Sequence, residues 1–174
     1  MLIVGGSLGA RTLNESVLAH LDLIKESGVQ FVWQTGKYYS AEISERMKGH
    51  DIPNLKITDF ISDMAAAYKA ADLVVSRAGA GSISEFCLLG KAVILVPSPN
   101  VAEDHQTKNA LALVNKQAAL YVKDSEAAKL LLPMAIDTVK DDAKLKSLST
   151  NILRMALPDS AEIIAKEVIK LANQ

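Results

Sequence analysis

The sequence has few of the features that mark secreted or membrane-spanning proteins. Its single cysteine, Cys87, excludes a disulfide within the chain and fits a reducing compartment such as the cytoplasm. No apolar run approaches the roughly 18 residues of a membrane-spanning helix. The N-terminal segment also lacks the basic stretch of a signal peptide. We therefore expect a cytoplasmic globular protein.

An excess of charge of either sign is also missing. The 19 basic side chains nearly balance the 20 acidic ones, so the net charge is −1, and neither sign forms a block. Nucleic-acid-binding domains carry a basic patch or stripe, so no nucleic-acid partner is expected. The 174 residues suffice for one domain with a hydrophobic core. A strand pattern starts at Leu2 without any lead-in, as in a domain cut from a longer chain.

Short aliphatic runs alternate with longer helical patterns up to about residue 125. Strands are expected at residues 2–4, 29–36, 55–61, 72–77, 92–99 and 119–123, and helices at 10–26, 38–49, 63–71, 82–90 and 104–116. This alternation predicts a Rossmann-like α/β domain with a doubly wound parallel sheet of about six strands. Three further helices are expected after Asp124. In the last of them Ala161, Ile164, Val168 and Leu171 share one face.

Two glycine-bearing turns follow strands of the predicted sheet. They read GGSLGA (5–10) after the first strand and AGAGS (78–82) after the fourth. In an open α/β sheet, ligands bind outside the carboxyl ends of the strands. The unpaired N–H groups at the start of the following helix form an anion site there. Two such turns at neighbouring strand ends would suit a diphosphate, although either turn alone is also explained by packing.

Glu85 lies one helical turn beyond Gly81. A carboxylate near a phosphate is repelled by it but accepts two hydrogen bonds well, so a vicinal diol such as that of ribose is the natural partner. The alternative is a glutamate that only complements the helix dipole.

A third polar cluster, PNVAEDHQTKNA (99–110), follows the fifth strand. Asp104 is expected to cap the next helix. His105, Gln106 and Asn109 would then lie near its first turns, where amides and imidazole can bracket sugar hydroxyls without adding charge. A plain surface role for His105 stays open.

Metal and dinucleotide sites are less well supported. His20 and His50 are far from His105 in the sequence and no D-x-D motif is present, so no metal site is expected. The first turn does not match the G-x-G-x-x-G fingerprint of dinucleotide-binding domains. The second strand ends in WQTG without the acidic residue that holds an adenosine ribose. Cys87 is interpreted as a core residue.

Several ordered motifs resemble the C-terminal half of the MurG family over essentially all 174 residues. They are GGSLGAR, TDFISDMAAAYKAADLVVSRAGAGSISE, VPSPNVAEDHQTKNA and DSAEIIAKEVIKLA. Members of that family are bacterial UDP-N-acetylglucosamine (UDP-GlcNAc) transferases that convert lipid I to lipid II in peptidoglycan synthesis. The resemblance implies one half of a GT-B glycosyltransferase and an inverting, metal-free transfer. It implies that acceptor binding and the general base belong to an N-terminal half outside this sequence.

The resemblance also implies roles for single residues. Ser7 would contact the diphosphate, the main chain of Ile61 would hold the uracil edge, and Glu85 would take the ribose hydroxyls. The other implied donor-site residues are Gly6, Gly9, Arg77, Ala80, Gly81, Ser82, His105, Gln106 and Asn109. Many relatives carry two glutamines where this chain has His105 and Gln106, so the sugar contacts of His105 stay open.

Two alternatives of other classes remain at this stage. One is a nucleotide-sugar-binding subunit of a transferase split into two chains, and the other is an NAD-binding oxidoreductase domain. The resemblance further implies a full-length protein on the cytoplasmic face of the inner membrane, because the acceptor is a lipid. It implies that the 174 residues bind the donor but turn over little by themselves.

Overall fold

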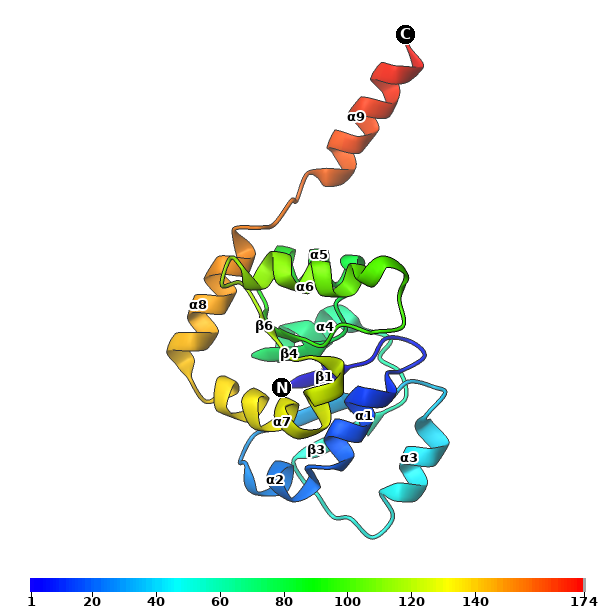
Figure 1. Ribbon diagram of the computed structural model, residues 1–174, viewed down its shortest axis with the longest axis vertical. Coiled ribbons are helices and arrows are strands. Elements are labelled where there is room, and N and C mark those ends of the chain that lie inside the picture. The colour runs from blue at the N-terminus through cyan, green and yellow to red at the C-terminus, as the bar shows by residue number, and fades with distance from the viewer. Residues whose placement is uncertain (174) are drawn as a thin grey trace.

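The computed structural model describes residues 1–173 and confirms a six-stranded, all-parallel α/β sheet (Figure 1). Its strands are β1 (Leu2–Val4), β2 (Phe31–Gln34), β3 (Leu55–Thr58), β4 (Leu73–Ser76), β5 (Ala92–Leu95) and β6 (Leu120–Tyr121). Its helices are α1 (Arg11–Leu18), α2 (Leu21–Glu26), α3 (Ser40–Arg46), α4 (Met64–Ala70), α5 (Ala80–Leu89), the 3-10 turn η1 (Ala102–Asp104), α6 (His105–Val114), α7 (Asp124–Val139), α8 (Asp142–Leu153) and α9 (Ser160–Ala172).

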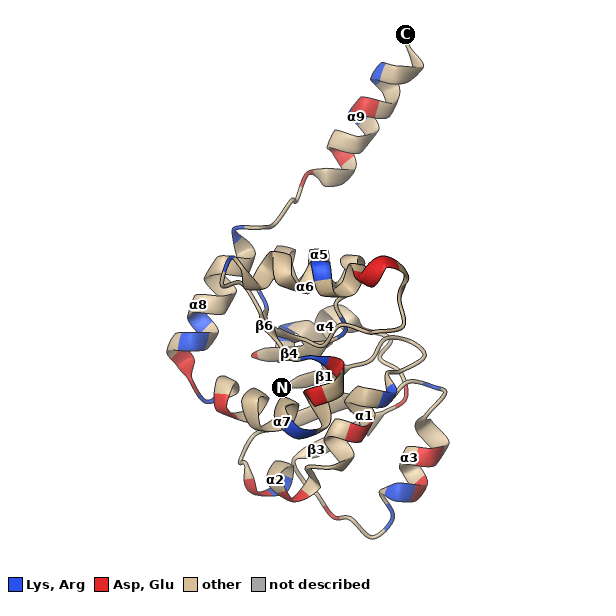
Figure 2. Ribbon diagram, in the orientation of Figure 1, with Lys and Arg blue, Asp and Glu red and all other residues tan. Residues whose placement is uncertain are grey.

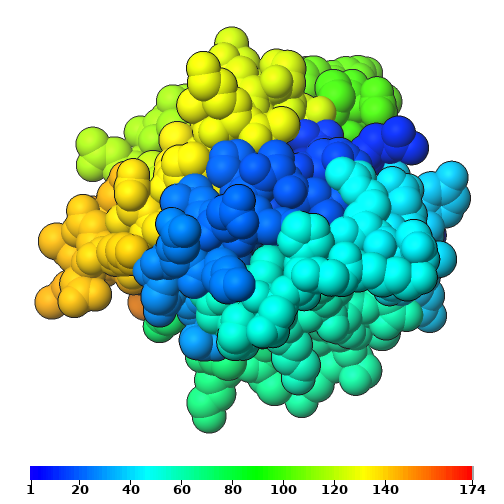
Figure 3. All heavy atoms as spheres, turned by 90° about the horizontal axis from the view of Figure 1, so that it is seen from below, coloured from blue at the N-terminus to red at the C-terminus, as the bar shows by residue number. Residues whose placement is uncertain are grey.

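Helices cover both faces of the sheet. Successive strand residues point to opposite sides, so Ile3 packs with α1, α2, α3 and α7, whereas Leu2 and Val4 pack with α4, α5 and α6. Figure 3 shows the blue residues of α1 and α2 beside the yellow residues of α7 on one side of the molecule. Strands β4 and β5 are buried along their whole length, which explains their continuous apolar sequences.

The strand order is β3-β2-β1-β4-β5-β6, so the chain reverses its direction of winding between β1 and β4. Val4 lies opposite Ser76 in the register of these two central strands. Ligands of doubly wound sheets bind at this switch point, outside the carboxyl ends of the strands. Both glycine turns follow these two strands, which confirms the expectation that they lie at neighbouring strand ends.

The prediction of one continuous helix over residues 10–26 is wrong. The chain forms two helices, α1 and α2, because His20 leaves the helical region with φ −130° and ψ 30°. The change of direction lets Leu21 and Ile24 of α2 reach the same core as Leu13 and Val17 of α1. Helical spacing alone did not reveal the break, since the apolar period continues through it.

Helix α9 projects from the sheet layers in Figure 1. Its expected apolar face is present but unburied: Ile164 is 64% exposed, Val168 60% and Leu171 67%. No residue of α9 in the described range is buried. The periodicity therefore predicted the helix correctly, but the apolar face has no packing partner among residues 1–173.

Figure 2 shows acidic and basic residues interspersed over the helices. The acidic residues Glu103 and Asp104 lie in the 3-10 turn before α6. Within residues 1–173, no helix combines the length and the apolar character that crossing a membrane requires.

Candidate functional site

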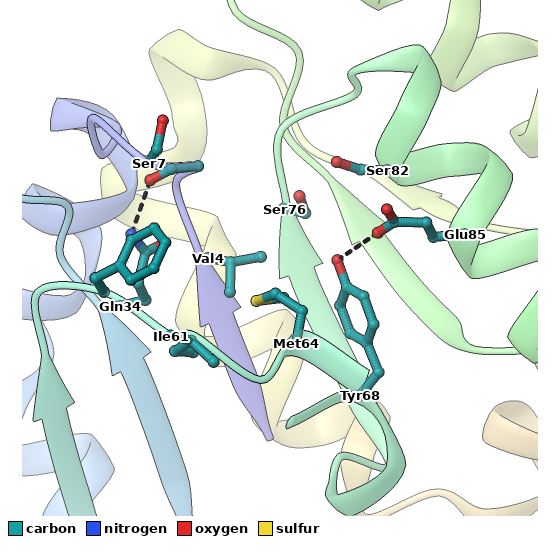
Figure 4. Close-up of a pocket in the computed structure, with 11 residues that line it drawn as sticks. Val4, Ser7, Gln34, Ile61, Met64, Tyr68, Ser76, Ser82 and Glu85 are labelled. Atoms are coloured by element: carbon teal, nitrogen blue, oxygen red, sulfur yellow. Dashed lines mark hydrogen bonds between the residues drawn. The ribbon is translucent and has the colours of Figure 1, made fainter. Parts of the chain in front are cut away.

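A cavity of about 240 Å³, smaller than most complete ligand pockets, opens where β1 and β4 end (Figure 4). We call it the switch-point cavity. Its lining residues are Val4, Gly6, Ser7, Gln34, Phe60, Ile61, Met64, Tyr68, Ser76, Ser82 and Glu85. Five residues predicted for the donor site meet here, namely Gly6, Ser7, Ile61, Ser82 and Glu85. They come from three separate segments of the sequence.

Helix α5 begins at this cavity with an uncapped N-terminus. Its N-cap residue, Gly79, is extended (φ −71°, ψ 139°), and no side chain accepts from the first turn. A Cβ atom added to Gly79 or Gly81 would meet nothing within 4 Å, so the space in front of the helix is open. The first-turn N–H groups of Ala80, Gly81 and Ser82 and the positive end of the helix dipole together form an anion-binding geometry.

The first glycine turn depends on close packing against the turn that follows β2. A Cβ on Gly9 would lie 2.1 Å from the carbonyl oxygen of Thr35, and one on Gly36 would lie 2.1 Å from the Gly9 nitrogen. The Gly9 N–H donates to the Gly6 carbonyl oxygen at 3.0 Å, which closes the turn. Gly9 therefore shapes the turn, whereas Gly6 and Ser7 face the switch-point cavity.

Glu85 is held by a neighbour that the sequence patterns did not single out. The Tyr68 hydroxyl, from α4, donates to Glu85 Oε2 at 3.1 Å, as Figure 4 shows. Burial, and secondly the charge of Glu85, raise the pKa of Tyr68. The Tyr68 ring packs edge-on against the Phe86 ring, with 5.4 Å between the ring centres. Glu85 Oε1 has no hydrogen-bond partner among the described residues and is available to a ligand.

Gln34 is a second cavity residue that was not predicted. Its side chain is buried at the end of β2 and makes three hydrogen bonds. Oε1 accepts from the Gly5 N–H at 3.2 Å, and Nε2 donates to the carbonyl oxygens of Gly6 at 2.8 Å and Asp59 at 3.1 Å. The available signal was a polar residue that ends an otherwise apolar strand.

Apolar side chains form the opposite wall of the switch-point cavity. Phe60, Ile61 and Met64 follow β3, and Phe60 is 45% exposed at the rim. The Lys37 ammonium lies 5.0 Å from the centre of the Phe60 ring, a cation–π distance. A planar base could pack against the apolar side chains of this wall. The sequence predicted only Ile61 of these residues, since Phe60 and Met64 also fit a core interpretation.

Arg77 does not point into the switch-point cavity. Its guanidinium pairs with the Asp124 carboxylate at the start of α7 and donates to the carbonyl oxygens of Val96 and Pro97 at 3.1 and 3.3 Å. The Thr12 hydroxyl donates to the other Asp124 oxygen at 2.9 Å. The structure thus gives Arg77 a role in joining β4, β5, α1 and α7, and its predicted donor contact stays a prediction.

A second cavity, of about 500 Å³ and so within the usual range for ligand pockets, lies on the other side of the first glycine turn and is lined in part by Gly9, Arg77 and Gln106. Gln106 Oε1 accepts from the Ser98 N–H at 2.9 Å, which ties the loop after β5 to α6. Asn109 donates to the Ala78 carbonyl oxygen at 3.1 Å. Ala80, Gly81, His105 and Asn109 line neither cavity.

The expected cap at Asp104 is wrong. Asp104 precedes α6 in a left-handed conformation (φ 50°, ψ 35°) and makes no side-chain capping bond. Capping requires an extended N-cap backbone, and here the 3-10 turn η1 leads directly into the helix. His105 is exposed, and its Nδ1 lies 2.9 Å from the Ala102 carbonyl oxygen.

Comparisons with known proteins extend over nearly the whole chain. A protein of Bacteroides fragilis named "UDP-N-acetylglucosamine--N-acetylmuramyl-(pentapeptide) pyrophosphoryl-undecaprenol N-acetylglucosamine transferase" is 68% identical over 100% of this chain and 46% of its own length. A protein of the same name from Cytophaga hutchinsonii is 51% identical over 99% of this chain and 46% of its own length. The chain thus spans less than half the length of these relatives.

Solved structures show the same fold. The crystal structure of Acinetobacter baumannii MurG superposes with a TM-score of 0.82 and 32% identity, over 97% of this chain and 49% of that one. The glycosyltransferase VinC, at 20% identity, shares the fold alone, with a TM-score of 0.69 over 99% of this chain and 41% of its own. These matches confirm the predicted half of a GT-B glycosyltransferase.

The family comparison agrees with the fold and the relatives. Residues 1–164 match the family described as the glycosyltransferase family 28 C-terminal domain. This span includes all six strands, both glycine turns and the switch-point cavity. The chain therefore belongs to the glycosyltransferase family 28 C-terminal domain family, as its resemblance to the MurG family implied.

Proposed function

We propose that residues 1–174 form one domain that binds UDP-GlcNAc, the donor half of an inverting transferase that adds GlcNAc to lipid I. One observation carries this proposal. Ser82 in the uncapped first turn of α5, the turn at Gly6 and Ser7, and Glu85 line a single cavity at the switch point. The name of the Bacteroides fragilis relative supplies the substrate class.

Each part of UDP-GlcNAc has a matching group in this arrangement. The diphosphate would lie against the first-turn N–H groups of α5 and the hydroxyls of Ser7 and Ser82. Glu85 Oε1 would accept from the ribose hydroxyls. The main chain of Ile61 would hold the uracil edge, with the ring against the apolar wall that contains Phe60.

The sugar would extend toward the second cavity. Gln106 lines that cavity, and His105 and Asn109 begin the same helix. Amide and imidazole groups hydrogen-bond sugar hydroxyls without placing another charge beside the diphosphate. In this arrangement Arg77 acts indirectly, because its salt bridge with Asp124 fixes the loop ends that form the cavity.

The reaction would be a displacement with inversion. The acceptor hydroxyl of lipid I attacks the anomeric carbon of GlcNAc and loses its proton to a general base, while the bond from that carbon to the UDP oxygen breaks. The start of α5 would stabilise the negative charge that develops on UDP. We place the general base in the other half of the full-length protein, together with lipid I binding and contact with the cytoplasmic membrane face.

Calorimetric titration of the 174-residue chain tests the proposal. We expect binding heats with UDP and with UDP-GlcNAc, no change of NADH fluorescence, and little or no lipid II formed by the chain alone. An absence of heat with millimolar UDP would contradict the donor site. The relatives are longer single chains, which favours a fused parent protein over the alternative of two separate subunits.

A further inference from the structure

Two loops that line the switch-point cavity belong to strands that do not pair with each other. The turn at Gly5 to Ser7 follows β1, and the loop at Asp59 to Ile61 follows β3. Strand β2 lies between these strands, with its last residue, Gln34, opposite Val4 of β1 and Thr58 of β3. The Gln34 side chain is therefore placed where it can reach both loops.

The hydrogen bonds of Gln34 join these two loops. It accepts from Gly5 and donates to Gly6 in the first turn, and it donates to Asp59 in the second loop. Among the described residues, no direct hydrogen bond joins the turn to the loop. Only a side-chain amide provides one acceptor and two donors in this planar arrangement. Gln34 is 5% exposed, so water does not readily replace these bonds.

We propose that Gln34 is a positioning residue that sets the separation between the phosphate end and the base end of the switch-point cavity. This inference rests on the proposed function, because it assigns the two ends to the diphosphate and the base of one nucleotide. A ligand that spans both ends, such as UDP, depends on their separation. Uridine has no phosphates and contacts one end alone, so its binding depends much less on the separation between the two ends.

The substitution Gln34→Glu tests the amide at nearly constant volume. The introduced carboxylate would face the carbonyl oxygens of Gly6 and Asp59, which repel it. Burial and this repulsion raise the pKa of the introduced carboxyl. Protonation restores one donor, so part of the positioning should return as the pH falls. Gln34→Leu removes all three bonds without adding charge, and Gln30→Glu, at an exposed position before β2, is the control.

UDP and uridine affinities are measured by calorimetry for the wild-type chain and the three variants, at about pH 8 and about pH 5.5, on either side of a raised carboxyl pKa. At the higher pH we expect UDP to bind Gln34→Glu about tenfold more weakly than wild type, with a much smaller change for uridine. At the lower pH the ratio of variant to wild-type UDP affinity should rise toward that of the Gln30→Glu control.

Three results would overturn the inference. The first is UDP binding by Gln34→Glu and Gln34→Leu that is as tight as in wild type. The second is an equal loss of affinity for UDP and for uridine, and the third is a Gln34→Glu deficit that does not change with pH. If Gln34→Glu does not fold at the higher pH, the UDP-to-uridine comparison in Gln34→Leu decides. A wild-type chain that does not bind UDP contradicts the proposed function itself, which separates that failure from a failure of the positioning role.

Discussion

The Tyr68 hydroxyl donates a hydrogen bond of 3.1 Å to Glu85 Oε2 and thereby joins α4 to α5 beside the switch-point cavity. Tyr68 is 4% exposed, whereas Glu85 is exposed. An exposed glutamate ordinarily samples several rotamers. The bond to a buried phenol limits this freedom and leaves Oε1 as the oxygen available to a ligand.

Removing the phenol oxygen should therefore weaken recognition of ribose. In Tyr68→Phe, UDP affinity should fall several-fold, which corresponds to about 0.5–1.5 kcal/mol, because Glu85 is no longer oriented. Deoxyuridine diphosphate lacks one ribose hydroxyl, so the substitution should weaken its binding less than it weakens UDP binding. Calorimetry with both nucleotides measures the ratio of UDP affinity to deoxyuridine diphosphate affinity in wild type and in Tyr68→Phe. Glu85→Gln is the companion variant. An unchanged ratio in Tyr68→Phe would show that Tyr68 does not act through Glu85.

The raised pKa of Tyr68 predicts how the free energy of unfolding changes at alkaline pH. Burial and the charge of Glu85 raise the pKa of Tyr68 in the folded chain above its ordinary value of 10.0. The unfolded chain therefore releases this proton first as the pH rises above that value. The stabilisation is complete below it and is lost as the pH rises toward the folded-state pKa.

Denaturant unfolding at several alkaline pH values measures this effect. The free energy of unfolding should fall by up to about 1.4 kcal/mol per pH unit more steeply in wild type than in Tyr68→Phe. Tyr38→Phe, at a position that is 76% exposed, is the control and should keep the wild-type slope. Parallel slopes for wild type and Tyr68→Phe would contradict the raised pKa.

Substitution of alanine for Gly9 and for Gly81 should change the free energy of unfolding in opposite directions. Gly9→Ala places a Cβ against the Thr35 carbonyl oxygen at a backbone φ of +86°, so it should lower the free energy of unfolding by roughly 3 kcal/mol. Gly81→Ala meets open space inside helix α5 and should raise it by about 0.5–1 kcal/mol. Chemical denaturation measures both, and similar values for the two variants would contradict the packing role of Gly9.

The network around Asp124 should contribute to stability. Asp124→Asn removes the ionic partner of Arg77, whose guanidinium is largely buried, and should lower the free energy of unfolding by about 1–3 kcal/mol. Thr12→Val removes only the hydrogen bond from Thr12 to Asp124 and should lower the free energy of unfolding by a smaller amount. The double variant should show a smaller loss than the sum of the two. Strict additivity would mean that the three side chains do not act as one network.

Cys87 should react slowly with alkylating reagents. It is 6% exposed on α5, and burial raises the pKa of its thiol, so little nucleophilic thiolate is present near neutral pH. Iodoacetamide modification, followed by mass spectrometry, should be at least about tenfold slower in the folded chain than in denaturant. Equal rates would show that α5 opens readily from the sheet.

Much of the fold was predictable because the local patterns are strong. The aliphatic runs within 72–77 and 92–99 predicted strands, and the structure forms β4 and β5 there. Gly90 ends α5 in the left-handed conformation that favours glycine after a helix. The break at His20 and the backbone of Asp104 were not predictable. The break lets α2 reach the same core as α1, and the Asp104 backbone follows from the 3-10 turn that leads into α6. Residue spacing encodes neither feature.

By itself, the sequence determined the parallel α/β sheet, the placement of two glycine turns at strand ends, and the family to which the chain belongs. Alternating strand and helix patterns leave few topologies, which is why these features could be read from the chain. Only the tertiary structure decided which polar side chains meet. It brought Gln34 to both loops, Tyr68 to Glu85 and Arg77 to Asp124 across 47 residues of sequence. Such pairings depend on strand order and side-chain direction, which bring distant segments together without leaving a local signal.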